Sequence, residues 1–313
     1  MLPDAAIHAG ARLLNAGLVY AACAFTWWGL FPIYIRLVTS VPSAEILAHR
    51  VVWCLLFVGA ALSWRGQWAW LRPVARQPRV LLAFMASALL IGGNWLAYIW
   101  AVSNGHVLDA SLGYFITPLV NVLLGTTLLH ERLRPPQWAA LSLAALGVVW
   151  LAWQAGHPPW VALVLATTFG GYGLLRKVAV LGALEGLTLE TMLLAPIALA
   201  VIGLAASHGT GSFPAADLPT NLWIIALGPV TAVPLLLFAA AARRLSMTTL
   251  GLMQYIGPTI QFAVGIWLFH EPFSTARLIG FGFIWLALVV YTADGLQVGR
   301  RAAARKAQTV AGS

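Results

Sequence analysis

An internal repeat constrains the fold of this chain more than any other feature of its sequence. Residues 110–131 (ASLGYFITPLVNVLLGTTLLHE) align without a gap with residues 250–271 (LGLMQYIGPTIQFAVGIWLFHE), 140 positions later. The identical positions are Leu112 with Leu252, Ile116 with Ile256, Pro118 with Pro258, Gly125 with Gly265, Leu128 with Leu268, His130 with His270 and Glu131 with Glu271. The two halves of the chain are therefore copies of one another.

Both copies are apolar, and similar apolar stretches recur from end to end. Charged residues make up 9% of the chain and its mean hydropathy is +0.86, whereas a soluble domain has about 25% charged residues. Because about 20 apolar residues cross a bilayer as a helix, we predict an all-α polytopic membrane protein with ten transmembrane helices. The predicted spans are 13–35, 44–64, 80–102, 110–130, 137–155, 158–175, 186–206, 220–242, 248–270 and 276–294.

The distribution of Lys and Arg predicts the orientation, because cytoplasmic loops are enriched in basic residues. With the N-terminus in the cytoplasm, fifteen of the eighteen basic residues fall on the inner side, and only Arg36, Arg50 and Arg277 fall on the outer side. The net charge of +9 is thus a topology signal, and no nucleic-acid partner is expected. We expect an inner-membrane protein with both termini in the cytoplasm.

This orientation makes the repeats inverted. The fourth span runs from outside to inside and its copy, the ninth, runs from inside to outside, since an odd number of helices separates them. We predict two five-helix repeats, residues 13–155 and 158–294, followed by a cytoplasmic tail, residues 295–313. Inverted repeats are a common construction of secondary transporters, which bind substrate near the bilayer midplane at the repeat interface.

Aromatic and amide side chains near the two repeated prolines are candidates for lining such a site. The candidate cavity residues are Trp28, Asn94, Tyr98, Tyr114, Asn121, Gln254, Tyr255 and Gln261. Hydrogen bonding between helices would satisfy the buried amides equally well. Pro118 and Pro258 each remove an intrahelical hydrogen bond, which predicts either a static bend or a flexing point beside the cavity.

Few charges fall within the spans. Glu45 and His49 are four residues apart and share a helix face, so they are candidates for a proton- or substrate-linked coupling pair; an outer-side salt bridge or a snorkelled anchor with Arg50 is the alternative. Glu131 is expected to end its helix and pair with Arg132 or Arg134. Glu190 and Asp294 are expected at the membrane interface. These assignments leave no ionisable residue at the midplane.

Motifs of nucleophilic, metal-dependent or nucleotide-dependent enzymes are absent from the sequence. The seven histidines are scattered, so we predict no metal site and no cofactor. Cys23 and Cys54 both fall inside apolar spans, which argues against a disulfide framework. An enzyme is therefore not expected, although a membrane scaffold or sensor stays open as an alternative.

Four segments resemble the RarD proteins, a branch of the EamA family in the drug/metabolite transporter superfamily. They are EILAHR (45–50), IGGNW (91–95), ASLGYFITPLVN (110–121) and QYIGPT (254–259), and the resemblance covers about residues 15 to 295. The resemblance implies a ten-helix inner-membrane carrier that exports small organic solutes, with chloramphenicol as one candidate. Histidine at positions 130 and 270 departs from the Gly-Glu pair that the resemblance leads us to expect.

Together these observations predict a secondary transporter that moves a small organic solute across the lipid bilayer by alternating access. Protons are a candidate coupling ion. An uncoupled facilitator of the same solutes is the main alternative.

Overall fold

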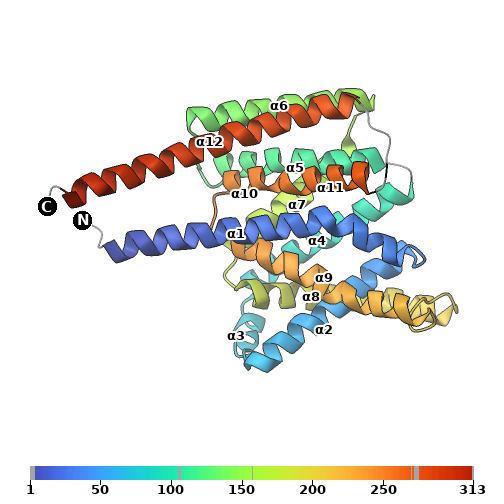
Figure 1. The fold of residues 1–313 in the computed structure, drawn as a ribbon. Helices are drawn as coiled ribbons and strands as arrows, with labels where there is room; N and C mark the ends of the chain where they lie inside the picture. Colours follow the sequence, from blue (N-terminus) through green and yellow to red (C-terminus); the bar gives the residue numbers. More distant parts are fainter. Residues whose placement is uncertain (1–3, 105–106, 157, 269, 271–274, 312–313) are drawn as a thin grey trace.

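The computed structural model describes residues 4–104, 107–156, 158–268, 270 and 275–311, and all regular secondary structure in these ranges is helical (Figure 1). The elements are α1 (Asp4–Ile35), the 3₁₀ turn η1 (Arg36–Val38), α2 (Ser43–Arg65), α3 (Leu71–Ala75), α4 (Pro78–Ser103), α5 (Val107–Thr127), α6 (Pro135–Ala155), α7 (Trp160–Val178), α8 (Ala183–Ser207), α9 (Leu218–Ala242), α10 (Met247–Gln254), α11 (Ile256–Trp267) and α12 (Thr275–Ala311).

Each predicted span corresponds to a helix or to a helix pair. Eight helices of the described chain, α1, α2, α4, α6 to α9 and α12, are long and apolar enough to cross a membrane. The fourth predicted span is α5, whose apolar part, Leu112–Thr127, is shorter. The ninth is α10 followed by α11, and α3 lies in the connection before α4. The predicted all-α polytopic membrane fold is confirmed.

The first and last helices extend beyond their predicted spans. α1 begins at Asp4 and α12 continues to Ala311, well past its apolar segment, Leu278–Gly295. The last part of α12 is rich in alanine, lysine and arginine, which are strong helix formers. The start of α1 and the end of α12 lie at the same end of the bundle (Figure 1), here called the termini end; the opposite end is the far end.

The ninth span is interrupted at Tyr255, between α10 and α11. Pro258 lies three residues later, and a proline both lacks an N–H and clashes with the carbonyl four residues before it. The break therefore falls where the proline weakens the helix. Its counterpart Pro118 lies inside α5, which is assigned as one continuous helix, so the two copies respond differently to the same residue.

Contacts between helices follow a two-fold pattern. Three of the close pairs, α2 with α8, α5 with α10 and α6 with α12, unite corresponding helices of the two halves. Other contacts recur when the two halves are interchanged. Helix α1 packs on α9 and α11, and its counterpart α7 packs on α4 and α5, which are the counterparts of α9 and α11. Tyr255 Oη donates to the Phe115 carbonyl at 3.1 Å, and these residues occupy the same position, 140 apart, in the two repeated stretches. Equivalent positions meet in this way only near a two-fold axis.

Close glycine contacts repeat the pattern. A Cβ at Gly29 of α1 would lie 2.7 Å from Cβ of Ile260, and a Cβ at Gly170 of α7 would lie 2.7 Å from Cγ1 of Val120. Val120 and Ile260 are again 140 positions apart. Small residues let helices approach closely in membranes, and here the residues that they approach occupy matching positions of the two repeated stretches. The boundaries 13–155 and 158–294, and the cytoplasmic tail at 295–313, stay predictions.

Candidate functional site

A cavity of about 110 Å³ lies between the two halves of the bundle. Helices of both halves contribute to its wall. It is lined by Phe25 and Trp28 of α1, Arg50 of α2, Ile91, Asn94, Trp95 and Tyr98 of α4, Gly113, Tyr114 and Thr117 of α5, Leu165 and Phe169 of α7, Leu235 of α9, Gln254 of α10, and Gly257, Pro258 and Gln261 of α11. An apolar, aromatic wall with a few polar groups is the usual character of a site for a small organic ligand.

The wall of the cavity differs in exposure between its parts. Tyr98 and Tyr114 are each 38% exposed, and their ring centroids are 6.2 Å apart. They flank the passage of α4 into α5, which lies at the far end (Figure 1). Gln254, in contrast, is only 6% exposed. The two tyrosines are therefore the more exposed part of the wall, and Gln254 is a buried part.

A cluster of packed aromatic rings borders the cavity. Phe238 of α9 lies within 6.1 Å, centroid to centroid, of four other rings. These rings belong to Phe25, Trp28, Phe169 and Tyr172. Tyr172 and Phe25 are each 1% exposed and Phe238 is fully buried.

Arg50 brings a positive charge into the cavity wall. Its Nε donates to Thr231 Oγ1 at 3.2 Å, and its guanidinium carbon lies 4.5 Å from the centroid of a Trp95 ring and 5.3 Å from that of Phe31. Among the side chains that the structure describes, no carboxylate lies within ion-pair distance of Arg50. The cavity therefore has an uncompensated cation in an aromatic wall.

Four amides tie the cavity helices together. Asn94 Nδ2 donates to the Leu165 carbonyl at 2.8 Å and to Thr168 Oγ1 at 2.9 Å. Asn121 Nδ2 donates to Gln254 Oε1 at 2.9 Å, and Gln261 Nε2 donates to the Trp28 carbonyl at 3.1 Å. These bonds join α4 to α7, α5 to α10, and α11 to α1. The amides thus hold helices together while three of these four side chains also face the cavity.

The predicted cavity residues lie at or beside this site. Trp28, Asn94, Tyr98, Tyr114, Gln254 and Gln261 line the cavity, as does Pro258. Asn121 and Tyr255 lie next to it and bind Gln254 and the Phe115 carbonyl, respectively. Pro118 is buried in α5 outside the wall. Roles in solute binding or flexing remain predictions for all of these residues.

Glu45 and His49 lie away from the cavity, near the N-terminus of α2. Glu45 Oε2 accepts a hydrogen bond from the Ser212 amide at 2.8 Å, and the His49 ring packs edge-on against Phe213 at 5.6 Å. Both side chains are buried, at 5% and 3% exposure. They hold the connection between α8 and α9 in place, and their coupling role stays a prediction.

Several ionisable side chains of the described chain lie within the helix bundle. Arg50 lines the cavity, and Arg176 and Glu190 are each only 1% exposed. The absence of an ionisable residue at the midplane and the interfacial position of Glu190 stay predictions. Arg176 Nη1 lies 3.5 Å from Glu190 Oε1, which also accepts a hydrogen bond from Ser87 at 2.6 Å. Hydropathy cannot distinguish a charge near a span end that faces neighbouring helices from one that faces the headgroups.

The expected pairing of Glu131 with a loop arginine was wrong. Its carboxylate accepts hydrogen bonds from the Met247 amide at 2.6 Å, the Thr248 amide at 3.0 Å and Thr248 Oγ1 at 2.9 Å. Glu131 therefore caps the N-terminus of α10, where free N–H groups and the helix dipole favour an anion. Arg134 instead pairs with Asp294 at 2.6 Å.

The turn before Glu131 keeps the geometry of a tight helix exit despite its histidine. His130 has φ +54° and His270 has φ +52°. This left-handed conformation favours glycine, which explains why the resemblance led us to expect glycine there. Histidine occupies the same conformation at both positions.

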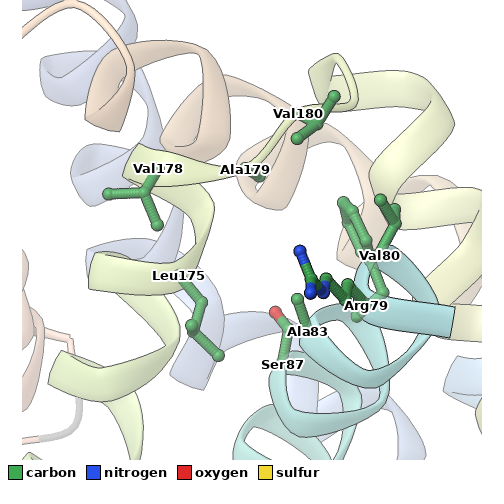
Figure 2. Close-up of a pocket in the computed structure, with 9 residues that line it drawn as sticks. Arg79, Val80, Ala83, Ser87, Leu175, Val178, Ala179 and Val180 are labelled. Atoms are coloured by element: carbon green, nitrogen blue, oxygen red, sulfur yellow. The ribbon is translucent and has the colours of Figure 1, made fainter. Parts of the chain in front are cut away.

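A second cavity, of about 200 Å³, lies toward the termini end between α4 and α7. Figure 2 shows Arg79 extending over Ser87, with Leu175 and Val178 of α7 across from it. Its wall is formed by Arg79, Val80, Ala83, Phe84, Ser87, Leu175, Val178, Ala179 and Val180. Ser87 connects this cavity to the buried Glu190.

Comparison with known proteins identifies the fold and the family. Residues 15–153 match the EamA-like transporter family. An uncharacterized transporter of Pseudomonas aeruginosa is 48% identical over 92% of this chain and 97% of its own length. Protein RarD of Escherichia coli is 43% identical over 93% of this chain and 98% of its own length. The chain belongs to the RarD branch of the EamA family.

Other comparisons agree with this membership. A protein of Pseudomonas aeruginosa named chloramphenicol-sensitive protein RarD is 32% identical over 94% of this chain and 99% of its own. A crystal structure with 20% sequence identity superposes with a TM-score of 0.69 and covers 91% of this chain and 99% of that one, which shows a shared fold. As a member of this family, the protein is a multi-pass membrane transporter.

Proposed function

We propose that the protein is a secondary carrier of the inner membrane, which exports small organic solutes by alternating access, with both termini in the cytoplasm. One observation carries the proposal: helices of both halves of the bundle build the wall of the central cavity. Membership of the EamA-like transporter family and the two-fold helix contacts support it. In inverted repeats, a rocking of one half against the other exposes a fixed site to each side in turn.

In this proposal the cavity residues have distinct roles. Trp28, Tyr98 and Tyr114 form the aromatic wall that contacts the solute. Asn94, Asn121, Gln254, Tyr255 and Gln261 contribute polar contacts and the hydrogen bonds between helices. Pro118 and Pro258 act as flexing points, supported at Pro258 by the break between α10 and α11. Glu45 and His49 remain the candidate pair for coupling to protons.

An uncoupled facilitator is the second candidate. Proton-coupled carriers commonly place a carboxylate on the solute pathway, and among the described residues the cavity wall includes no Asp or Glu. This composition favours a carrier driven by the solute gradient itself. Dissipation of the proton gradient would leave such a facilitator working.

Uptake into proteoliposomes containing the purified protein tests the proposal. The solutes are a panel of amino acids, aromatic metabolites and chloramphenicol, each with and without an imposed pH gradient. Saturable uptake of any member supports a carrier, and acceleration by the gradient supports proton coupling. Absence of flux for every member would contradict transport and favour a scaffold or sensor.

Variants locate the pathway. Asn94→Ala and Tyr114→Ala are expected to lower uptake by about fivefold to 150-fold, since each removes a contact worth on the order of 1–3 kcal/mol, without lowering membrane abundance. Leu96→Ala is the matched control, because Leu96 lies on α4 outside the cavity wall and is 60% exposed. Equal loss of uptake and abundance in both cavity variants would indicate a folding defect instead.

A further inference from the structure

We propose that Arg50 makes the central cavity a binding site for organic monoanions, and that the natural solute has a carboxylate attached to an apolar or aromatic body. The proposal rests on the proposed transport function for the movement of the solute, but not for its binding. Of the described residues that line the cavity, Arg50 alone is charged.

The partners of Arg50 leave most of its hydrogen-bonding capacity unused. A guanidinium has five N–H donors, and the Arg50 Nε bond to Thr231 Oγ1 uses one of them. Trp95 and Phe31 contact the flat face of the group, and contacts of that kind leave its edge free for hydrogen bonding. Within the described residues, neither terminal nitrogen of Arg50 has a hydrogen-bond acceptor.

Other arginines of the same chain show how a structural arginine is satisfied here. Arg176, which is only 1% exposed, has Glu190 at 3.5 Å, and its Nη2 donates to the carbonyls of Gly182 and Ala183. Arg134 has Asp294. Arg50 has neither a carboxylate nor a carbonyl partner, although a lone charge within a membrane is expensive. An anionic ligand would relieve that cost.

The chemistry of the wall narrows the anion to a carboxylate. The planar guanidinium fork matches the two oxygens of a carboxylate. One positive charge balances one negative charge, whereas a phosphate monoester with up to two charges would leave one uncompensated. Trp28, Tyr98, Tyr114 and Phe169 surround the remaining space with aromatic surface, which suits an apolar body. The same cation would repel amines.

Arg50 and Thr231 form one unit in this proposal. Thr231 lies on α9 and is 2% exposed, so its hydroxyl holds the Arg50 Nε while the fork faces the cavity. Replacing Thr231 with valine keeps the shape and removes this bond. This variant separates the effect of the orientation of the guanidinium on acid binding from the effect of its charge.

The test is competition binding on the full-length protein, purified in detergent, by scintillation proximity. The radiolabelled probes are 3-phenylpropionate, indole-3-acetate and hexanoate, and the competitors are the same acids, their amides and the matching amines. We expect the acids to compete about tenfold to hundredfold better than the amides, the range for a charge-assisted hydrogen bond, and the amines to compete least.

Variants assign this preference to Arg50. Arg50→Gln should remove the acid preference, Arg50→Lys should retain part of it, and Thr231→Val should weaken acid binding by a smaller factor than Arg50→Gln. Arg65→Gln makes the same charge change on an exposed turn of α2 and should bind acids like the wild type. Gel filtration and thermal unfolding verify that each variant is folded.

Equal competition by acids and amides in the wild type would overturn the proposal, as would an acid preference that survives in folded Arg50→Gln. Failure of all three acids to bind would overturn it too. Flux in proteoliposomes separates this result from the transport proposal. Arg50-dependent acid binding without flux would refute transport and leave the anion site standing, whereas flux of neutral amides without acid preference would do the reverse.

Discussion

The buried pair of Arg176 and Glu190 yields the sharpest prediction for stability. Both side chains are 1% exposed, and their closest charged atoms are 3.5 Å apart. Removing one partner of such a pair leaves an uncompensated buried charge and costs about 3–5 kcal/mol. Replacing both residues removes both charges, and the stability of such a double variant can be close to that of the wild type.

The variants Arg176→Met, Glu190→Gln and their combination test this directly. Glutamine at position 190 keeps an oxygen that can accept the Ser87 hydroxyl, now 2.6 Å from Glu190 Oε1. We expect each single variant to lower the free energy of unfolding by about 3–5 kcal/mol. The double variant should lose less than either single variant, so the effects are far from additive.

The two single variants should also differ from each other. A carboxylate left alone can take up a proton and become neutral, whereas a guanidinium cannot lose its charge. Glu190→Gln is therefore expected to be the more damaging change. Equilibrium unfolding with sodium dodecyl sulfate in mixed micelles measures all three variants. Additive losses, or a double variant worse than both singles, would refute the reasoning that the two charges stabilise each other.

Three further predictions follow from the described contacts. Glu131→Ala should destabilise the protein by about 2–4 kcal/mol in the same unfolding assay, because it removes three hydrogen bonds at the start of α10; an unchanged stability would contradict the capping role. Gly251→Ala should lower the free energy of unfolding by about 1–3 kcal/mol through overpacking, since its Cβ would lie 2.8 Å from the Pro118 carbonyl oxygen. Gly93→Ala has open space around it and should be neutral or stabilising by up to about 1 kcal/mol. Equal effects of the two variants would refute the close contact of Gly251 with α5. The third prediction applies if Arg50 selects a monoanion and no ion is co-transported. A valinomycin-imposed potential of about 100 mV, positive inside, should then raise the equilibrium accumulation of the acid roughly fifty-fold, the equivalent of about 2.3 kcal/mol per charge. Accumulation that does not depend on the potential would instead indicate coupling to one proton.

Much of the architecture could be predicted because it depends on periodic and repeated features of the sequence. Membrane spans follow from apolar length, and the repeat follows from identity between residues 110–131 and 250–271. Six cavity residues were found because aromatic and amide side chains are unusual inside apolar spans. The break at Tyr255, in contrast, could not be distinguished from the continuous helix around Pro118, because neighbouring helices decide how a proline is accommodated.

Charged residues were the hardest to place. Arg176 stands beside Lys177 at the end of a span, where sequence alone suggests a loop, but α7 continues to Val178 and turns directly into α8. Glu131 was expected to pair with a neighbour in sequence, and its partners are backbone amides 116 and 117 residues later. The partners of Arg176 and Glu131 lie on other elements, which hydropathy and local spacing do not encode.

The central claim is that one cavity between the two halves faces each side of the membrane in turn. Two-sided labelling of Thr117→Cys tests it most directly, because Thr117 lines the cavity and is 2% exposed. The native thiols are first removed with Cys23→Ser and Cys54→Ala. A membrane-impermeant maleimide is then applied to right-side-out spheroplasts and to inverted vesicles. Alternating access predicts labelling from both sides, and labelling from one side alone would contradict it.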